Sequence, residues 1–130
     1  MSVAPAAPRQ RADRPLILDR RARLIGTLVF DGEVQLSGRI EGEVRCRKLH
    51  LTEHGSIKGD IVAEHAVILG EVIGSIYATH LMLGAACTVE GDIYHRHLVL
   101  EKGCYFEGRS RRHGDPIALA ERHLGPSSEI

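Results

Sequence analysis

The chain of 130 residues has no tryptophan and only two phenylalanines and three tyrosines. A compact core of this size normally uses more aromatic side chains. The longest apolar run, residues 66–69, is far shorter than the roughly 20 residues of a transmembrane helix, and residues 1–15 lack the apolar segment of a signal peptide. We therefore expect a cytoplasmic protein whose Cys46, Cys87 and Cys104 stay reduced.

Signatures of several enzyme and binding classes are also missing. There is no phosphate-binding loop, no G-x-S-x-G motif and no H-E-x-x-H motif. No C-x-x-C pair indicates a zinc site, and no basic, aromatic-rich face indicates nucleic-acid binding. We expect no enzyme activity, no catalytic residue, no metal, no cofactor and no nucleic-acid partner.

The formal net charge is zero but unevenly spread. Residues 1–23 carry six Arg against two Asp, residues 24–108 carry seven basic and twelve acidic side chains, and residues 109–130 carry four Arg against three acids. A basic tail beside an acidic body could bind an anionic partner or another copy's body, or simply be solvated.

Glycine is abundant, and six of the 14 glycines recur in one repeated motif. They are Gly26, Gly42, Gly59, Gly74, Gly91 and Gly108, at spacings of 16, 17, 15, 17 and 17 residues. Apolar and polar residues alternate around each of them, which is the period of a strand. One such strand cannot bury its apolar face alone, but stacked copies can. The sequence therefore predicts an all-β fold, a single triangular parallel β-helix of five to six coils with flexible termini.

The repeat register predicts which side chains stack inside the coils. The expected inward ladders are Ile40, Ile57, Val72, Val89 and Phe106; Val44, Ile61, Ile76 and Ile93; Leu49, Ala66, Leu81 and Leu98; and Leu51, Ile68, Leu83 and Leu100. The repeat glycines have inward parity too, so we expect them where the backbone bends or crowds.

Neither end of this β-helix has an obvious polar cap. Soluble solenoids usually carry capping repeats, and an open strand edge invites pairing with another chain. The candidate polymerisation interface comprises Leu24, Ile25, Leu28 and Phe30 in the first coil and Tyr105 and Phe106 in the last. The alternative for Phe106 is that it only fills the core of its own monomer.

Four segments carry a resemblance to a known family. The stretch Gly-Arg-Ile-Glu-Gly-Glu-Val at 38–44, together with 55–61 and 89–93, resembles the bactofilin domain, and residues 101–108 are similar to that family's last coil. The resemblance spans about residues 16–112. It implies a right-handed β-helix that joins end to end into non-polar filaments without nucleotide.

The resemblance also implies a cytoskeletal scaffold for cell shape, morphogenesis or the localisation of cell-envelope enzymes. Its partners would be further copies of itself, and cell-wall enzymes or other morphogenetic proteins recruited through the tails. Many members of the family carry an N-terminal membrane-targeting segment. Here the six N-terminal arginines would allow weak peripheral attraction to the inner face of the cytoplasmic membrane.

Further ladders are expected on the outside of the coils. Val67, Met82 and Val99 form an apolar stripe that is a candidate for lateral contact between filaments, or ordinary strand filling. His65, His80 and His97 should stack above Lys48, either as a metal or pH sensor or as a plain polar ladder.

Two other groups share register positions. Cys87 and Cys104 should be inward neighbours and are expected as buried thiols. The acids are Glu43, Asp60 and Asp92 in one ladder and Glu41, Glu90 and Glu107 in the next; they are expected to solubilise the surface, since no cleft for paired-carboxylate catalysis is evident.

We expect the chain to divide into a disordered basic tail (1–15), a bactofilin-like β-helix domain (16–112) and a flexible or short-helical tail (113–130). In residues 113–130, Asp115 is expected as a helix N-cap, Pro116 as the first helical residue and Gly125 as the end of the helix, and disorder of this tail is favoured in the free protein.

The alternative function is a hexapeptide-repeat acyltransferase. That class keeps six-residue units in coils of eighteen, which the mixed spacing here argues against.

Overall fold

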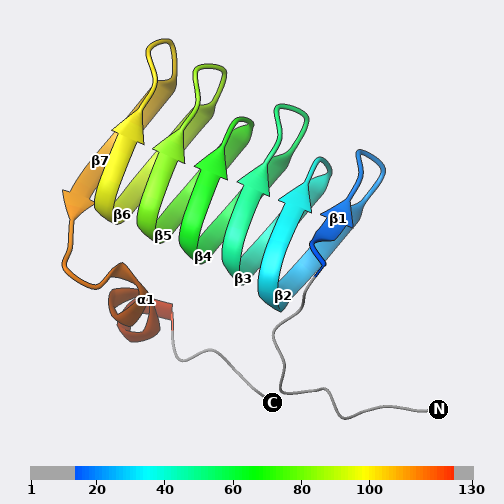
Figure 1. Ribbon diagram of the computed structural model, residues 1–130, viewed down its shortest axis with the longest axis horizontal. Helices are drawn as coiled ribbons and strands as arrows, with labels where there is room; N and C mark the ends of the chain where they lie inside the picture. Colours follow the sequence, from blue (N-terminus) through cyan, green and yellow to red (C-terminus); the bar gives the residue numbers. More distant parts are fainter. Residues whose placement is uncertain (1–13, 125–130) are drawn as a thin grey trace.

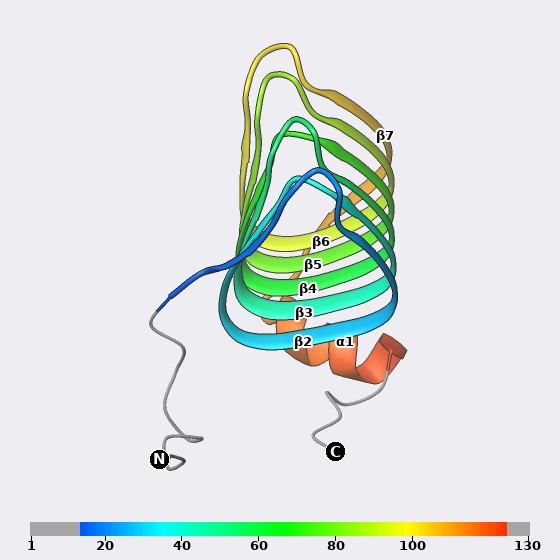
Figure 2. The ribbon, with the colours of Figure 1, turned by 90° about the vertical axis from the view of Figure 1, so that its right-hand side faces the viewer.

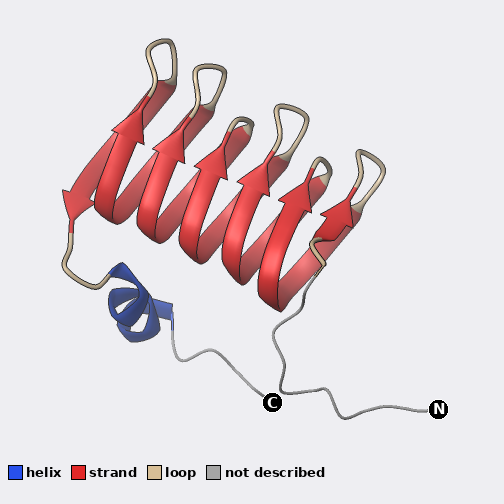
Figure 3. Cartoon of the chain, in the orientation of Figure 1, coloured by secondary structure: helices blue, strands red, loops and turns tan. Residues whose placement is uncertain are grey.

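The structure is a computed structural model, which describes residues 14–124. These residues form one sheet of seven parallel strands in sequence order, followed by a helix (Figures 1 and 3). The elements are β1 (Leu16–Leu18), β2 (Arg23–Leu36), β3 (Arg39–Leu51), β4 (Ser56–Ile68), β5 (Glu71–Leu83), β6 (Thr88–Leu100), β7 (Tyr105–Arg112) and α1 (Pro116–Leu124). The predicted parallel β-helix is confirmed. The expectations for residues 1–13 and for Gly125 lie outside the described residues.

The strands pair in the register that the repeat predicts. Ile57 pairs with Ile40 below it and with Val72 above it, and Val89 pairs with Phe106. Each long strand bends around the axis, so that a coil seen end-on is a rounded triangle with its loops at one corner (Figure 2). The inward ladders fill the interior, and Ile57, Ile61, Ile68 and Val72 are completely buried.

Irregular repeat lengths are absorbed outside the paired segments. The 15-residue repeat has only Leu69 and Gly70 between β4 and β5, where the next connection uses four residues, 84–87. The 16-residue repeat combines a two-residue connection, 37–38, with a register shift between Phe30 and Glu33. Stacking is therefore preserved because loops and a bulge take up the difference.

Helix α1 packs along the outside of one wall of the coil (Figure 2). Asp115 caps it as predicted, since its Oδ1 accepts a hydrogen bond from the Ala118 N–H at 3.2 Å. Ala120 is buried against Val62 and Tyr77. Disorder, which the sequence favoured here, is thus wrong for residues 116–124. The reason is that outward apolar side chains on β4 and β5 offer this short helix a surface on which to bury its own.

Candidate polymerisation interface

The N-terminal end of the solenoid is only half covered. β1 pairs with Val34–Leu36 of β2, whereas the segment Arg23–Phe30 pairs only with β3 among the described strands. The inward side chains Leu24, Leu28 and Phe30 pack on the core but stay partly exposed. In the next coil, at the positions above Leu24 and Leu28, Ile40 and Val44 are at most 1% exposed. This end therefore presents a free strand edge beside an apolar surface.

The C-terminal end is half covered in the opposite way. β7 pairs with Thr88–His95 of β6, and within residues 14–124 no strand pairs with the outer side of 97–100. Leu100 is consequently 52% exposed, although Leu83 directly below it is fully buried. Leu98 is also partly exposed. The predicted burial of Leu100 is thus wrong.

The sequence indicates that residues 97–100 stay uncovered, but the indication lies outside the repeat motif around the glycines. In the inner coils, the motif glycine is followed by an apolar pair such as Leu81 and Leu83 or Leu98 and Leu100. After Gly108 the residues at the same spacing are Asp115, which is charged, and Ile117, which lies in helix α1. The last coil therefore has no third side to lay over Leu98 and Leu100.

The two end faces differ in polarity. At the N-terminal end, Leu16 and Leu18 of β1 join the three apolar side chains of β2. At the C-terminal end, Ser110 lies at the inward position above Ile93, and Arg112 lies above His95. His95 Nε2 lies 2.9 Å from Ser110 Oγ. Burial, and secondarily Arg112, lower the pKa of His95, so the imidazole is held neutral under a partly polar cap.

Two predicted interface residues point away from the end faces. Ile25, 81% exposed, pairs with Glu41 on an outward ladder. Tyr105 is also exposed, and its hydroxyl donates to Glu107 Oε1 at 3.0 Å. Phe106 is inward and packs on the core of its own chain at the last coil, where it remains partly exposed. The structure thus brings together Leu24, Leu28 and Phe30 at one end, and Phe106, Leu98 and Leu100 at the other.

The repeat glycines lie at a tight corner of each coil. All six have a positive φ, between 128° and 140°, which costs glycine little and other residues more. From Gly42 onward, a Cβ would also overlap the carbonyl group of the repeat glycine in the preceding coil. At Gly26 a Cβ would meet nothing within 4 Å, because no such glycine precedes it.

The predicted outward histidine ladder is present. The rings of His65 and His80 stack with centroids 4.7 Å apart, and those of His80 and His97 with centroids 4.9 Å apart. The planes are within 9° of parallel. Val67, Met82 and Val99 form the neighbouring ladder, as expected. Among residues 14–124 no group of three or more His, Cys, Asp or Glu is placed to hold a metal ion.

The cysteines of the described chain are free thiols. Burial raises the pKa of Cys46 to about 12. Burial, and then the neighbouring Cys104, raise the pKa of Cys87 to about 11; Cys87 is buried as predicted, whereas Cys104 in the last coil is only partly buried. These raised pKa values keep Cys46 and Cys87 protonated and unreactive at neutral pH.

The predicted acidic ladders are in register. Glu43 pairs with Asp60, and Glu90 with Glu107. Burial, and then repulsion from Glu43, raise the pKa of Asp60, with Arg45 acting in the opposite direction. Arg45 forms an ion pair with Glu43, so the ladder is partly neutralised.

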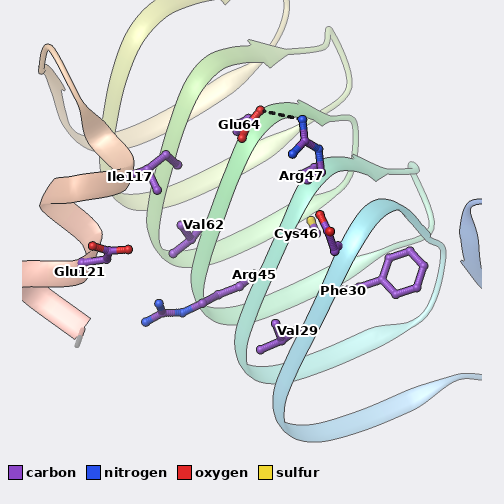
Figure 4. A pocket seen from close by; sticks show the side chains of 10 residues that line it. Val29, Phe30, Arg45, Cys46, Arg47, Val62, Glu64, Ile117 and Glu121 are labelled. Atoms are coloured by element: carbon purple, nitrogen blue, oxygen red, sulfur yellow. Dashed lines mark ion pairs between the residues drawn. The ribbon is translucent and has the colours of Figure 1, made fainter. Parts of the chain in front are cut away.

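A groove of about 290 Å³ lies beside α1 on the wall that the helix covers. Figure 4 shows Ile117 and Glu121 of the helix on one side of it, with Val62 and Arg45 on the coils opposite. An ion pair between Arg47 and Glu64, 3.6 Å apart, crosses adjacent coils at its edge. No pattern in the sequence indicates this groove, because α1 and the coils meet only in the folded chain.

No helix within the described chain has both the length and the apolarity needed to cross a bilayer. The family model of the bactofilins, described as polymer-forming cytoskeletal, matches residues 16–111. A solved structure, that of the cytoskeletal bactofilin BacA by solid-state NMR, is similar with a TM-score of 0.72 and 32% identity. The similarity covers 76% of this chain and 96% of that one. Among the curated proteins, none matches the chain.

Proposed function

The chain belongs to the bactofilin family, described as polymer-forming cytoskeletal, and on this premise we propose that it assembles end to end into non-polar filaments without nucleotide. The observation that carries the proposal is the half-covered coil at each end. Each end combines a free strand edge with partly exposed leucines, Leu28 at one and Leu100 at the other. Docking of a second copy would pair these edges and bury the leucines.

The polarity of the two faces favours joining like ends. If the repeat continued head to tail, Leu28 would lie on Ser110 and Phe30 on Arg112 in the register of the coils. Such a join would place the polar Ser110 and Arg112 against the apolar Leu28 and Phe30, so the two joined surfaces would differ in polarity. Joining two N-terminal ends by a two-fold axis instead places apolar side chains against apolar side chains.

Joining two C-terminal ends would bring Leu98, Leu100 and Phe106 of each copy together. Arg112 is exposed at this face, and its long side chain can keep the guanidinium group in water while its stem packs. The resulting filament alternates two kinds of junction, so it has no polarity.

Variants that block one junction test this arrangement. Leu28→Arg should remove the N-terminal junction and Leu100→Arg the C-terminal junction, so each single variant should stop at dimers and the double variant at monomers. Phe106→Arg should behave as Leu100→Arg does, and Ile73→Arg, on an outer wall in the middle of the rod, should leave filaments unchanged. Analytical ultracentrifugation and negative-stain microscopy would measure assembly, with circular dichroism to check folding.

A non-polar filament and a polar filament predict different results for these variants. In a polar filament every junction uses both faces, so each single variant would be a monomer; that result would overturn the non-polar arrangement. Folded variants that all form long filaments would overturn end-to-end joining itself.

We propose that the filament is a cytoplasmic scaffold at the inner face of the membrane, which supports cell shape or positions envelope enzymes through the tails. Support comes from the family, and from Arg14, Arg20, Arg21 and Arg23 at the N-terminal coil, all of which are exposed. Filaments should co-sediment with vesicles containing anionic lipid and less with neutral ones. Equal sedimentation with both would contradict an electrostatic contact.

A further inference from the structure

Four arginines gather where the loops of the first two coils lie, and we call this cluster the arginine corner. Arg20 and Arg21 lie in the turn between β1 and β2, Arg23 begins β2, and Arg39 begins β3. All four are exposed, and they line an open hollow of about 310 Å³. The other polar side chains that line it are Ser37, His54 and Ser56. Among the described residues, none of those that line the hollow is a carboxylate.

Backbone hydrogen bonds hold the arginine corner in one shape. The Ala22 N–H donates to the Asp19 carbonyl at 3.0 Å and the Arg21 N–H to Asp19 Oδ1 at 2.9 Å, which fixes the first turn. The Arg39 N–H donates to the Ala22 carbonyl at 3.0 Å and so ties the next coil to that turn. Gly38 is buried here, and a Cβ on it would overlap the same carbonyl. The arginines therefore project from a closely packed, hydrogen-bonded backbone.

The positive charge of the arginine corner is not balanced within the fold. Arg23 and Arg39 occupy paired positions on neighbouring strands, about 4.8 Å apart, and like charges placed side by side destabilise a sheet. Within residues 14–124, neither of them forms an ion pair, and nor do the two turn arginines. Elsewhere on the rod arginines do pair, as Arg47 does with Glu64. The unbalanced charge indicates that this corner takes an anion from solution.

Three carboxylates belong to the same loops and ladder, but they do not fill this role. Asp19 accepts the Arg21 backbone N–H. Glu71, one coil beyond Ser56, accepts a hydrogen bond from the serine hydroxyl at 3.5 Å. Glu53 lies in the loop that contributes the histidine, but it does not line the hollow. None of the three forms an ion pair with an arginine of the described corner.

The chemistry of the donors indicates the ligand. A guanidinium group presents a planar fork of N–H donors that binds phosphate oxygens two at a time, and the serine hydroxyls and the imidazole add further donors. One phosphate group carries a charge of about −1.5 to −2 at pH 7, which leaves much of the charge of four arginines unbalanced. We propose that the arginine corner binds two or three phosphate groups held close together, as in a di- or triphosphate. The inference does not rest on the proposed filament.

Equilibrium dialysis of the full-length chain against sodium triphosphate at pH 7.5 tests this site. We expect one triphosphate per chain, bound at least tenfold more tightly than inorganic phosphate or citrate. Arg23→Gln combined with Arg39→Gln should weaken binding roughly tenfold or more, since two charged donors are lost. Arg109→Gln combined with Arg111→Gln makes the same change in net charge on exposed residues of β7, at the other end of the rod, and should bind as the unchanged chain does.

A second pair of variants tests the location of the ligand without removing an arginine. Ser56→Asp places a carboxylate in the hollow and should abolish binding. Thr88→Asp adds the same charge in the same ladder two coils away, at a residue that is also half-buried, and should leave binding unchanged. Circular dichroism would check that each variant is folded. Equal losses for Ser56→Asp and Thr88→Asp, or for the two arginine pairs, would mean general attraction to a positive chain and overturn the site.

Phosphate groups held close together occur both in soluble oligophosphates and in lipid headgroups with two phosphates, so vesicles distinguish these sources. Co-sedimentation would compare cardiolipin, whose headgroup carries two phosphates, with phosphatidylglycerol at equal lipid charge. A preference for cardiolipin that Ser56→Asp abolishes and triphosphate competes away would support the site and add the lipid as a source. Triphosphate binding without that preference would support a soluble ligand alone. Absence of both, or citrate binding as tightly as triphosphate, would overturn the inference.

Discussion

The carbonyl group of Gly42 occupies the space that a side chain on Gly59 would need. The same relationship links each later repeat glycine to the one before it. Glycine is therefore required at this corner by the preceding coil as well as by its own positive φ. Gly26 differs, because its backbone also has a positive φ but no coil blocks the position.

We expect Gly59→Ala to be far more damaging than Gly26→Ala. Gly26→Ala meets only the backbone strain of its φ of 128°, about 1–3 kcal/mol, whereas Gly59→Ala must also displace backbone of the preceding coil. Urea unfolding in the Leu28→Arg, Leu100→Arg background would compare the two without filament formation. Equal losses would show that φ, and not the stacked glycine, imposes the residue.

We expect His95 to contribute an acid-sensitive term to stability. Its pKa is lowered in the folded chain from an ordinary value of 6.5 by burial and then by Arg112, so the unfolded chain binds the proton more readily. Stability is therefore lost as the pH falls below 6.5. His95→Gln should flatten the dependence of the unfolding free energy between pH 7 and pH 5. His54→Gln, in an exposed loop, is the matched control and should leave the slope due to His95 in place.

We expect Asp60→Asn to stabilise the fold at neutral pH. Burial, and then Glu43, raise the pKa of Asp60 in the folded chain, so folding favours the protonated carboxyl. The free-energy cost of ionising Asp60 in the folded chain appears as the pH rises above the ordinary pKa of aspartate and is fully present above the raised pKa. The unfolding free energy of Asp60→Asn should exceed that of the unchanged chain at pH 7, and the gain should shrink toward pH 3. A gain that does not change with pH would contradict this origin.

We expect Tyr77→Phe to loosen α1 from the rod. The Tyr77 hydroxyl lies 2.9 Å from His123 Nδ1, and burial raises the pKa of Tyr77 to about 12, with Tyr94 as the next cause. Loss of this hydrogen bond should cost about 0.5–1.5 kcal/mol. Hydrogen exchange should become faster in residues 116–124 and stay unchanged in β4 and β5. Unchanged exchange in α1 would mean that apolar packing alone holds the helix.

The stacking of the coils could be predicted because each coil repeats the same chemistry. Ile57, Val72 and Val89 occupy one position in successive copies, and only stacking buries all of them. The placement of Leu100 could not be read from its own repeat, because its exposure depends on whether a further coil segment covers it. Likewise, the repeat motif did not distinguish Ile25 and Tyr105, which strand alternation turns outward, from their inward neighbours in the candidate interface.

The sequence by itself determined the parallel register, the inward ladders and the glycine corners, because these follow from local alternation repeated along the chain. Only the tertiary structure decided which halves of the terminal coils stay open and where α1 packs. Those features depend on what lies next to a residue across coils or against the helix. A repeat specifies its own neighbours, but it does not specify where the stack stops or what covers its sides.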